Sequence, residues 1–402
     1  MTNIEDTSDN LELLTTITRR VFRIDDTTLG TDKQGFIVRY RGQLVIDSEI
    51  AYEQLNKALK TYDITPLFRL ENGVETIFLI KGVVKPKPSN PWVNAILFVL
   101  TLFSVLFAGA IYNYQGPQSD NFLTSIKNIL LNIGAGWPFA LSMLAILGAH
   151  EFGHYLVARY HGTNVTLPYF IPFPFSPFGT MGAFIQMKEL PKNKRHLMDI
   201  GIAGPLAGLV VAIPILIYGL ATSKINTLPM VFPPGQVFEG NSILYLSLKF
   251  IVLGEWLPKP VSFGGVSPLL YWIRYFFTGM PMPYGGIDVT VNSVAWAGWA
   301  GLLVTALNLI PVGQLDGGHL IYVIFGKRAR KMVPFILIVL IVLGLFWQGW
   351  LLWAFLIFIF GRTQAEPLDQ ITQLDSRRKA LAILGIIVFV LVFTPVPLAG
   401  AL

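Results

Sequence analysis

The sequence contains no cysteine, so disulfide bonds, thiolate metal sites and cysteine nucleophiles are excluded. It also has little charge: only 13% of its 402 residues are charged, against about 25% in ordinary globular proteins, whereas 53% are hydrophobic. No basic stripe indicates a nucleic-acid partner. These features predict a mainly α-helical, polytopic membrane protein that contacts the lipid bilayer and binds no nucleic acid.

The first 90 residues differ from the rest, because they hold 12 basic and 13 acidic side chains and few long apolar runs. The chain opens on a polar, acid-rich segment without the apolar core or cleavage site of a signal peptide, so we expect the N-terminus in the cytoplasm. Amphipathic and alternating patterns predict a small soluble α/β domain over residues 1–85, followed by a membrane domain over residues 86–402.

The soluble domain is expected to have the order α-β-β-α-β-β. Arg41-Gly42 predicts a first hairpin turn, and Asn72-Gly73 predicts a second. Between the hairpins, Ser48–Tyr62 has helical spacing, with Ser48 as the N-cap. The stretch Lys81–Pro91 is rich in lysine and proline, which is typical of a stiff linker.

The residues after 90 contain apolar stretches sufficient for about six or seven transmembrane helices. The stretches are Pro91–Tyr112, Trp137–Tyr160, Leu197–Leu220, Trp296–Ile324, Val333–Phe360 and Leu381–Val396. Val333–Phe360 fits either one long tilted helix or a tight hairpin, and we favour the hairpin. Two shorter apolar segments, Ser242–Gly254 and Pro268–Phe277, predict interfacial or re-entrant helices within residues 222–292.

Basic residues indicate the orientation in the membrane. Segments 159–196, 326–332 and 361–379 hold 13 of the 18 Lys and Arg that follow residue 90. Cytoplasmic loops carry an excess of such residues, so we expect these three segments to face the cytoplasm.

The strongest chemical signal is His150-Glu151-Phe152-Gly153-His154, which lies inside an apolar stretch. On a helix, residues i and i+4 share a face, so both imidazoles can bind one zinc ion while Glu151 activates a water. Ionisable groups in hydrocarbon are costly and usually mark function. The alternative, two core histidines bonded to neighbours, is disfavoured because these groups gain nothing from an apolar surrounding.

A catalytic zinc site needs a third protein ligand, and Asp316 is the candidate. His150 lies nine residues before Arg159, about 13 Å along a helix, and Asp316 lies eleven before Lys327, about 16 Å at the same rise. Both groups are therefore expected at a similar depth below the cytoplasmic face. The alternative for Asp316 is a capping or turn role beside Gly317-Gly318.

The remaining histidines compete only weakly as ligands. His319 fits a polar residue at a helix start better than a ligand. His161 and His196 lie near the expected cytoplasmic surface among basic residues, where we expect them to be solvated.

Two motifs resemble those of the site-2 family of intramembrane zinc metalloproteases. His150-Glu151-x-x-His154 matches the first motif, and Asn308-x-x-Pro311-x-x-x-Leu315-Asp316-Gly317-Gly318 matches the second. The resemblance covers residues 137–325 and is strongest to the branch of plastid EGY-type proteins and their prokaryotic relatives. No PDZ domain is recognised between the motifs.

This resemblance implies a three-helix catalytic core in which His150, His154 and Asp316 bind one Zn²⁺ per chain. It makes Glu151 the general base and Asn308 a donor to the developing oxyanion, although Asn308 also fits a helix-packing amide. The implied activity is cleavage of transmembrane protein substrates near the cytoplasmic side of a prokaryotic cell membrane, with residues 1–85 open to a regulatory partner.

Two other functions are compatible with the fold: a catalytically inactive scaffold, and a metal transporter. The filled motifs speak against the scaffold. The transporter would need polar residues along a route across the membrane, and few occur outside the site. Finally, Gly182–Gln186 is a candidate exposed strand that could receive an extended substrate by β-addition, or else an amphipathic loop at the membrane surface.

Overall fold

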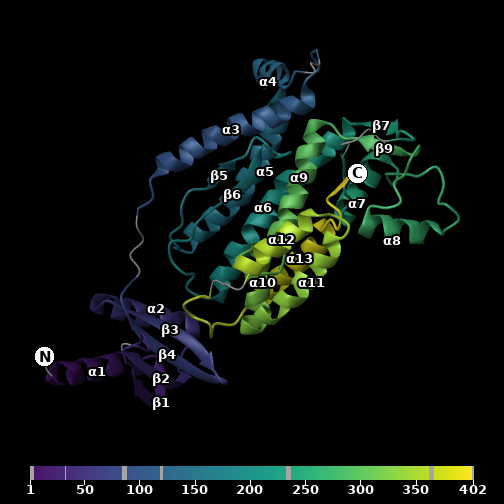
Figure 1. The fold of residues 1–402 in the computed structure, drawn as a ribbon. Coiled ribbons are helices and arrows are strands. Elements are labelled where there is room, and N and C mark those ends of the chain that lie inside the picture. Colours follow the sequence, from purple (N-terminus) through teal and green to yellow (C-terminus); the bar gives the residue numbers. More distant parts are fainter. Residues whose placement is uncertain are drawn as a thin grey trace.

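The computed structural model describes residues 4–31, 33–83, 88–117, 121–231, 237–361 and 366–400. Figure 1 shows an N-terminal unit at one end, next to a larger helical body that carries the rest of the chain. The domain boundary predicted between residues 85 and 86 lies outside the described residues.

The N-terminal unit is an antiparallel four-stranded sheet with two helices, in the strand order β1-β2-β4-β3. The order of helices and strands agrees with the predicted α-β-β-α-β-β, but the two strands expected on either side of Arg41-Gly42 are a single strand, β2, and β1 lies where no strand is predicted. The elements are α1 (Ile4–Arg19), β1 (Phe22–Leu29), β2 (Val38–Leu44), α2 (Ser48–Leu59), the 3₁₀ turn η1 (Lys60–Tyr62), β3 (Ile64–Glu71) and β4 (Val74–Lys81). Buried apolar residues from both helices and all four strands form its own core.

Two local predictions in this unit are wrong and one is confirmed. Arg41 and Gly42 form no turn but lie within β2, where a Cβ on Gly42 would stand 1.8 Å from the Arg23 carbonyl oxygen of β1. Asp47, not Ser48, caps α2 by accepting from the Glu49 N–H. The hairpin at Asn72-Gly73 is confirmed, with positive φ at both residues (52° and 84°), as a type I′ turn requires.

Three helices of the body are long and apolar enough to cross a membrane. They are α3 (Pro91–Asn113), α5 (Trp137–Tyr160) and α6 (Lys194–Ala221), and the short helices α4 (Phe122–Leu131) and η2 (Ile133–Gly136) lead from α3 to α5. These coincide with the first three predicted spans. Helices α5, α6 and α9 (Ser293–Asn308) pack on one another around a shared core.

The C-terminal part consists of shorter helices. They are α10 (Asp316–Phe325), the 3₁₀ segment η3 (Gly326–Met332), α11 (Val333–Gly344), α12 (Gly349–Phe360) and α13 (Ser376–Val392). The hairpin favoured for Val333–Phe360 is confirmed, because α11 and α12 are separate 12-residue helices that pack on each other. A 12-residue helix is about 18 Å long, short of the hydrocarbon thickness, so the count of six or seven spans stays a prediction.

The described residues of the stretch 222–292 lie at the end of the body away from the N-terminal unit (Figure 1). They contain the short helices α7 (Ile243–Leu253) and α8 (Pro268–Thr278), close to the predicted segments, and the strands β7 (Lys224–Thr227), β8 (Val237–Glu239) and β9 (Ile287–Thr290). The C-terminal strand β10 (Leu398–Gly400) pairs with β8. Lys249 of α7 is fully buried, with its Nζ 3.6 Å from Glu239 and 3.4 Å from Asp288, an ion cluster that no sequence pattern indicated.

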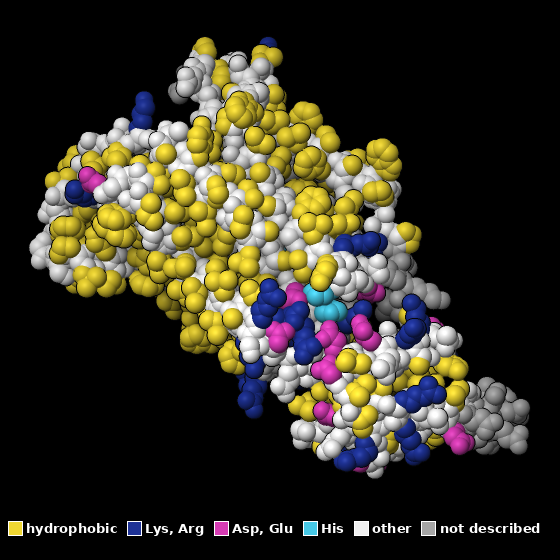
Figure 2. Space-filling model, turned by 180° about the vertical axis from the view of Figure 1, so that it is seen from behind, with side chains coloured by type: hydrophobic (Ala, Val, Ile, Leu, Met, Phe, Trp, Pro, Cys, Tyr) yellow, Lys and Arg dark blue, Asp and Glu magenta, His cyan; other side chains and the backbone are white. Residues whose placement is uncertain are grey.

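Ionic and backbone contacts join the N-terminal unit to the body. Glu49 accepts hydrogen bonds from Asn193 and Arg195 at the start of α6, and the Ser48 hydroxyl donates to Asp369 over 2.6 Å. Phe68 lies in β3, the edge strand of the sheet, and forms backbone hydrogen bonds with residues 368 and 370. Figure 2 shows charged and histidine side chains gathered at this junction, below the largely apolar surface of the body.

The prediction that His161 and His196 are solvated is wrong. His196 is 8% exposed, the two rings stack with centroids 4.1 Å apart, and His161 Nε2 lies 2.9 Å from Asp199. The N-terminal unit covers this surface, which makes it an interface rather than solvent-facing loop.

The Glu49 contact predicts an acid-sensitive junction. Burial raises the pKa of Glu49, but hydrogen bonds from Asn193 and Arg195 outweigh burial and lower the pKa below its ordinary value of 4.5. A lowered pKa means that the contact stabilises the junction above pH 4.5 and is lost as the pH falls through the folded-state value. The protection of α2 amides from hydrogen exchange, taken relative to the intrinsic rate at each pH, should therefore fall on acidification more in the wild type than in Glu49→Gln. An equal fall in both would contradict this, and Glu12→Gln, at an exposed position of α1, serves as the control.

Candidate metal centre and active site

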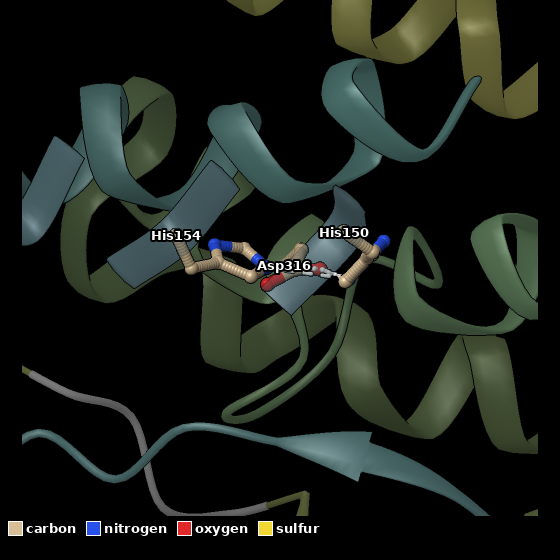
Figure 3. Close-up of side chains that lie close together, drawn as sticks. All are labelled: His150, His154 and Asp316. Carbon is tan, nitrogen blue, oxygen red and sulfur yellow. Dashed lines mark hydrogen bonds and ion pairs between the residues drawn. The ribbon is translucent and has the colours of Figure 1, made fainter. Parts of the chain in front are cut away.

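Three side chains from two helices converge in the lower part of the body. His150 and His154 lie one turn apart on α5, and Asp316 is the first residue of α10. Asp316 Oδ2 is 3.3 Å from Nε2 of each histidine, and the two Nε2 atoms are themselves 3.3 Å apart. Figure 3 shows the three side chains pointing toward one another.

The turn before α10 places Asp316 at this point. Gly317 and Gly318 pack directly on that turn, since a Cβ on Gly317 would stand 2.0 Å from the Leu309 carbonyl oxygen and one on Gly318 would stand 2.4 Å from the Gly313 oxygen. The N-cap position is Leu315, which makes no side-chain cap bond. The Gly-Gly pair therefore seats the helix start against the turn, and the Asp316 carboxylate faces the histidines rather than capping the helix.

Helix α6 supports the histidines from the other side. The Ile200 carbonyl oxygen lies 2.7 Å from His154 Nδ1, which fixes the proton on Nδ1 and leaves the Nε2 lone pair directed at the cluster. Gly204 faces the same ring so closely that a Cβ there would stand 2.0 Å from Nε2, and Gly208 faces His150 at 3.3 Å. The two glycines, four residues apart on α6, thus leave the space that the two imidazoles occupy.

The geometry fits a tetrahedral zinc site. Zinc bound by imidazole and carboxylate at about 2.0–2.1 Å in a tetrahedron places its ligand atoms about 3.3–3.4 Å apart. All three separations in the cluster are 3.3 Å. Two histidines and one carboxylate also leave a fourth position open, as in catalytic rather than structural zinc sites.

The other predicted site residues surround this cluster. Glu151 is 4% exposed and interacts with the backbone of Ile185. Asn308, the last residue of α9, brings its side-chain Nδ2 to 3.1 Å from His150 Nε2. His319 lies in the first turn of α10 and lines the same cavity, outside the group of three.

The site opens into a cavity of about 920 Å³. One wall is the segment 183–190, which begins in β6 (Thr180–Phe184), is paired as far as Met187 and bends at Lys188 and Glu189. β6 pairs with β5 (Tyr169–Pro172), and residues 186–188 pair with residues 164–166. Because β5 packs on α3 and β6 contacts α5, the edge not paired with β5 is turned toward the site.

Sequence reasoning identified the cluster but missed its support. The Ile200 carbonyl carries no residue-type signal, and glycine is common in membrane helices, so the glycines of α6 carry little signal alone. The convergence of a histidine face with a glycine face is visible once α5 and α6 are known to be neighbours.

Comparisons with known proteins agree with this site. The sequence matches the family described as Peptidase family M50 over residues 138–346, just over half of the 402 residues. It is 30% identical to "Probable zinc metalloprotease EGY1, chloroplastic" of Arabidopsis thaliana over 79% of this chain and 56% of that protein. It is also 30% identical to "Probable zinc metalloprotease EGY2, chloroplastic" of the same plant, over 90% of this chain and 61% of the relative.

The chain thus spans about three fifths of the length of these relatives. No solved structure matches the chain. The resemblance drawn from the two motifs is confirmed by the matched region, which contains both of them. The chain therefore belongs to peptidase family M50, the site-2 protease family, and has EGY-type proteins among its relatives.

Proposed function

We propose that this protein is an intramembrane zinc metalloendopeptidase that cleaves transmembrane protein substrates near the cytoplasmic side. The observation that carries the proposal is the tetrahedral spacing of His150, His154 and Asp316 beside the buried carboxylate of Glu151. A carboxylate next to a zinc position with one open site is the arrangement used for metal-assisted peptide hydrolysis.

The residues take distinct roles in this proposal. His150, His154 and Asp316 hold one Zn²⁺, which when bound supplies a Lewis acid that polarises the scissile carbonyl and acidifies the attacking water. Glu151 accepts the proton of that water and returns it to the leaving amine. The Asn308 amide, 3.1 Å from His150 Nε2, lies close enough to donate to the oxyanion as charge develops on it.

The edge of β6 that is not paired with β5, with the segment that follows β6, gives a route for presenting the substrate. A helical substrate hides its peptide bonds, so the segment to be cut must become extended. The edge of segment 183–187 turned toward the site can receive that segment by β-addition. The interaction of Glu151 with the backbone of Ile185 places the proposed base beside this edge.

The proposal includes an orientation. The soluble unit and the basic residues around the start of α6 lie at the same end of the molecule, which supports a cytoplasmic N-terminus and a cut near the cytoplasmic leaflet. The six or seven spans and the prokaryotic cell membrane belong to the same proposal; the relatives named above carry "chloroplastic" in their own names.

Metal analysis separates the enzyme from an inactive scaffold. Purified wild-type protein is expected to contain about one zinc per chain, because three ligand atoms already have tetrahedral spacing. His154→Ala and Asp316→Ala should each lose it, whereas His161→Ala, outside the cluster, should retain it. Wild-type protein that binds no zinc at micromolar concentration would refute the proposed chemistry.

A further inference from the structure

We propose that the cleft between the N-terminal unit and the helical body binds the cytoplasmic segment of the substrate in extended form, so that the N-terminal unit contributes to substrate selection. The inference rests on the proposed proteolytic function. It assigns a role to residues 1–85, for which the motifs and the comparisons give none.

The cleft is a cavity of about 760 Å³ at the junction. One side is formed by the end of α2 and the turn before β3, including Asn56, Lys60 and Asp63. The other side is formed by the loop after α5 and the segment before α6, including Glu189 and Leu190. Most of the lining residues have polar side chains, in contrast to the largely apolar surface of the helical body (Figure 2).

This cleft continues the cavity of the metal centre. Glu189 and Leu190 line both cavities. The segment that leads to them is the same wall, residues 183–190, that faces the site, and it bends at Lys188 and Glu189. A substrate strand that pairs at Ile185 and follows this wall therefore reaches Leu190 after about five residues, at most about 17 Å at the rise of a β-strand. Substrate residues about four to seven positions from the scissile bond would then lie in the cleft.

The N-terminal unit is held in a fixed position beside this path. The backbone bonds of Phe68 with residues 368 and 370 add a segment of the body to the edge of β3. Arg69 donates to the Leu368 carbonyl oxygen over 2.7 Å, and Glu49 binds the start of α6. These contacts keep the cleft open at a defined distance from the metal centre.

The charges indicate which side chains a substrate would meet. Asp63 accepts a hydrogen bond from the Val83 N–H, and Glu189 accepts two from Asn164. Lys60 is exposed and forms no ion pair within the described part of the chain, whereas Lys192, which also lines the cleft, lies 3.8 Å from Glu53. We therefore infer a polar substrate segment with an acidic side chain opposite Lys60.

A library of single-span model proteins, with the eight residues on the cytoplasmic side of the span randomised, tests the inference. Wild-type enzyme in liposomes should favour acidic residues about four to seven positions from the cut. Lys60→Glu should shift this preference from acidic toward basic residues by about 5-fold, the size expected for an exposed charge pair. The preference at the positions flanking the cut should stay unchanged. Lys57→Glu makes the same charge change on α2 outside the cleft lining and should behave like the wild type.

Photo-crosslinking to a library member locates the bound segment without relying on cleavage. In Glu151→Gln, a crosslinking residue at Ile185 reports binding at the metal centre, one at Asn56 reports the cleft, and one at Thr28 on the distant strand β1 is the control. Crosslinks at Ile185 and Asn56 but not Thr28 support the inference. Crosslinks at Ile185 alone, or a profile unchanged by Lys60→Glu, overturn it while the proteolytic function stands. No crosslink at Ile185 and no cleavage by the wild type would overturn both.

Discussion

Replacing Glu151 with glutamine is expected to lower the rate of substrate cleavage by about 10²–10⁴-fold, the usual contribution of a general base, and to leave the zinc content unchanged. Glutamine has nearly the same shape as glutamate but cannot accept the proton of the attacking water. The three candidate ligand atoms belong to other residues, so metal binding is not expected to depend on the Glu151 carboxylate.

The measurement compares purified wild type and Glu151→Gln on single-span proteins that accumulate in cells expressing the variant. Glu12→Gln makes the same chemical change at an exposed position of α1 and should cleave like the wild type. Undiminished cleavage by Glu151→Gln, with zinc present in both proteins, would show that Glu151 is not the general base. The edge of segment 183–187 would then have no catalytic residue beside it.

The two histidines of the metal cluster could be predicted from sequence because their signal is local. His150 and His154 are four residues apart on a continuous apolar helix, and helical periodicity alone places them on one face. Asp316 follows by elimination, because besides Glu151 it is the other carboxylate within apolar sequence. Its expected depth below the cytoplasmic face also matches that of His150. The structure places its oxygen 3.3 Å from both imidazoles, so a rough estimate of depth was sufficient.

The errors share a different cause, which is contact between segments far apart in the chain. Gly42 has the composition of a turn, but its missing Cβ is required by the approach of β1. His161 and His196 have the flanking charges of a solvated loop, but a separate folded unit covers them. Lys249 would be expected at a membrane surface, but it is buried by carboxylates from β8 and β9. Each of these partners lies ten or more residues away along the chain, beyond the reach of a local sequence pattern.

Gly204 is the position where a single added methyl group is expected to have the largest effect on the metal centre. A Cβ there would stand 2.0 Å from Nε2 of His154, far inside van der Waals contact. The imidazole cannot retreat freely, because its Nδ1 is bonded to the Ile200 carbonyl oxygen over 2.7 Å. We therefore expect Gly204→Ala to weaken zinc binding by at least about 100-fold, the upper range for losing ligand orientation, and to abolish cleavage.

Two further glycines provide graded controls for this test. Gly208 faces His150 at 3.3 Å, so Gly208→Ala should weaken zinc binding less than Gly204→Ala. Gly148 lies on α5 two residues before His150 and would meet no atom within 4 Å, so Gly148→Ala should keep both zinc and activity. Zinc content, circular dichroism and thermal unfolding of the three variants separate loss of the site from loss of the fold. Full zinc occupancy in folded Gly204→Ala would show that His154 is not held where the structure places it, and would require a different third ligand.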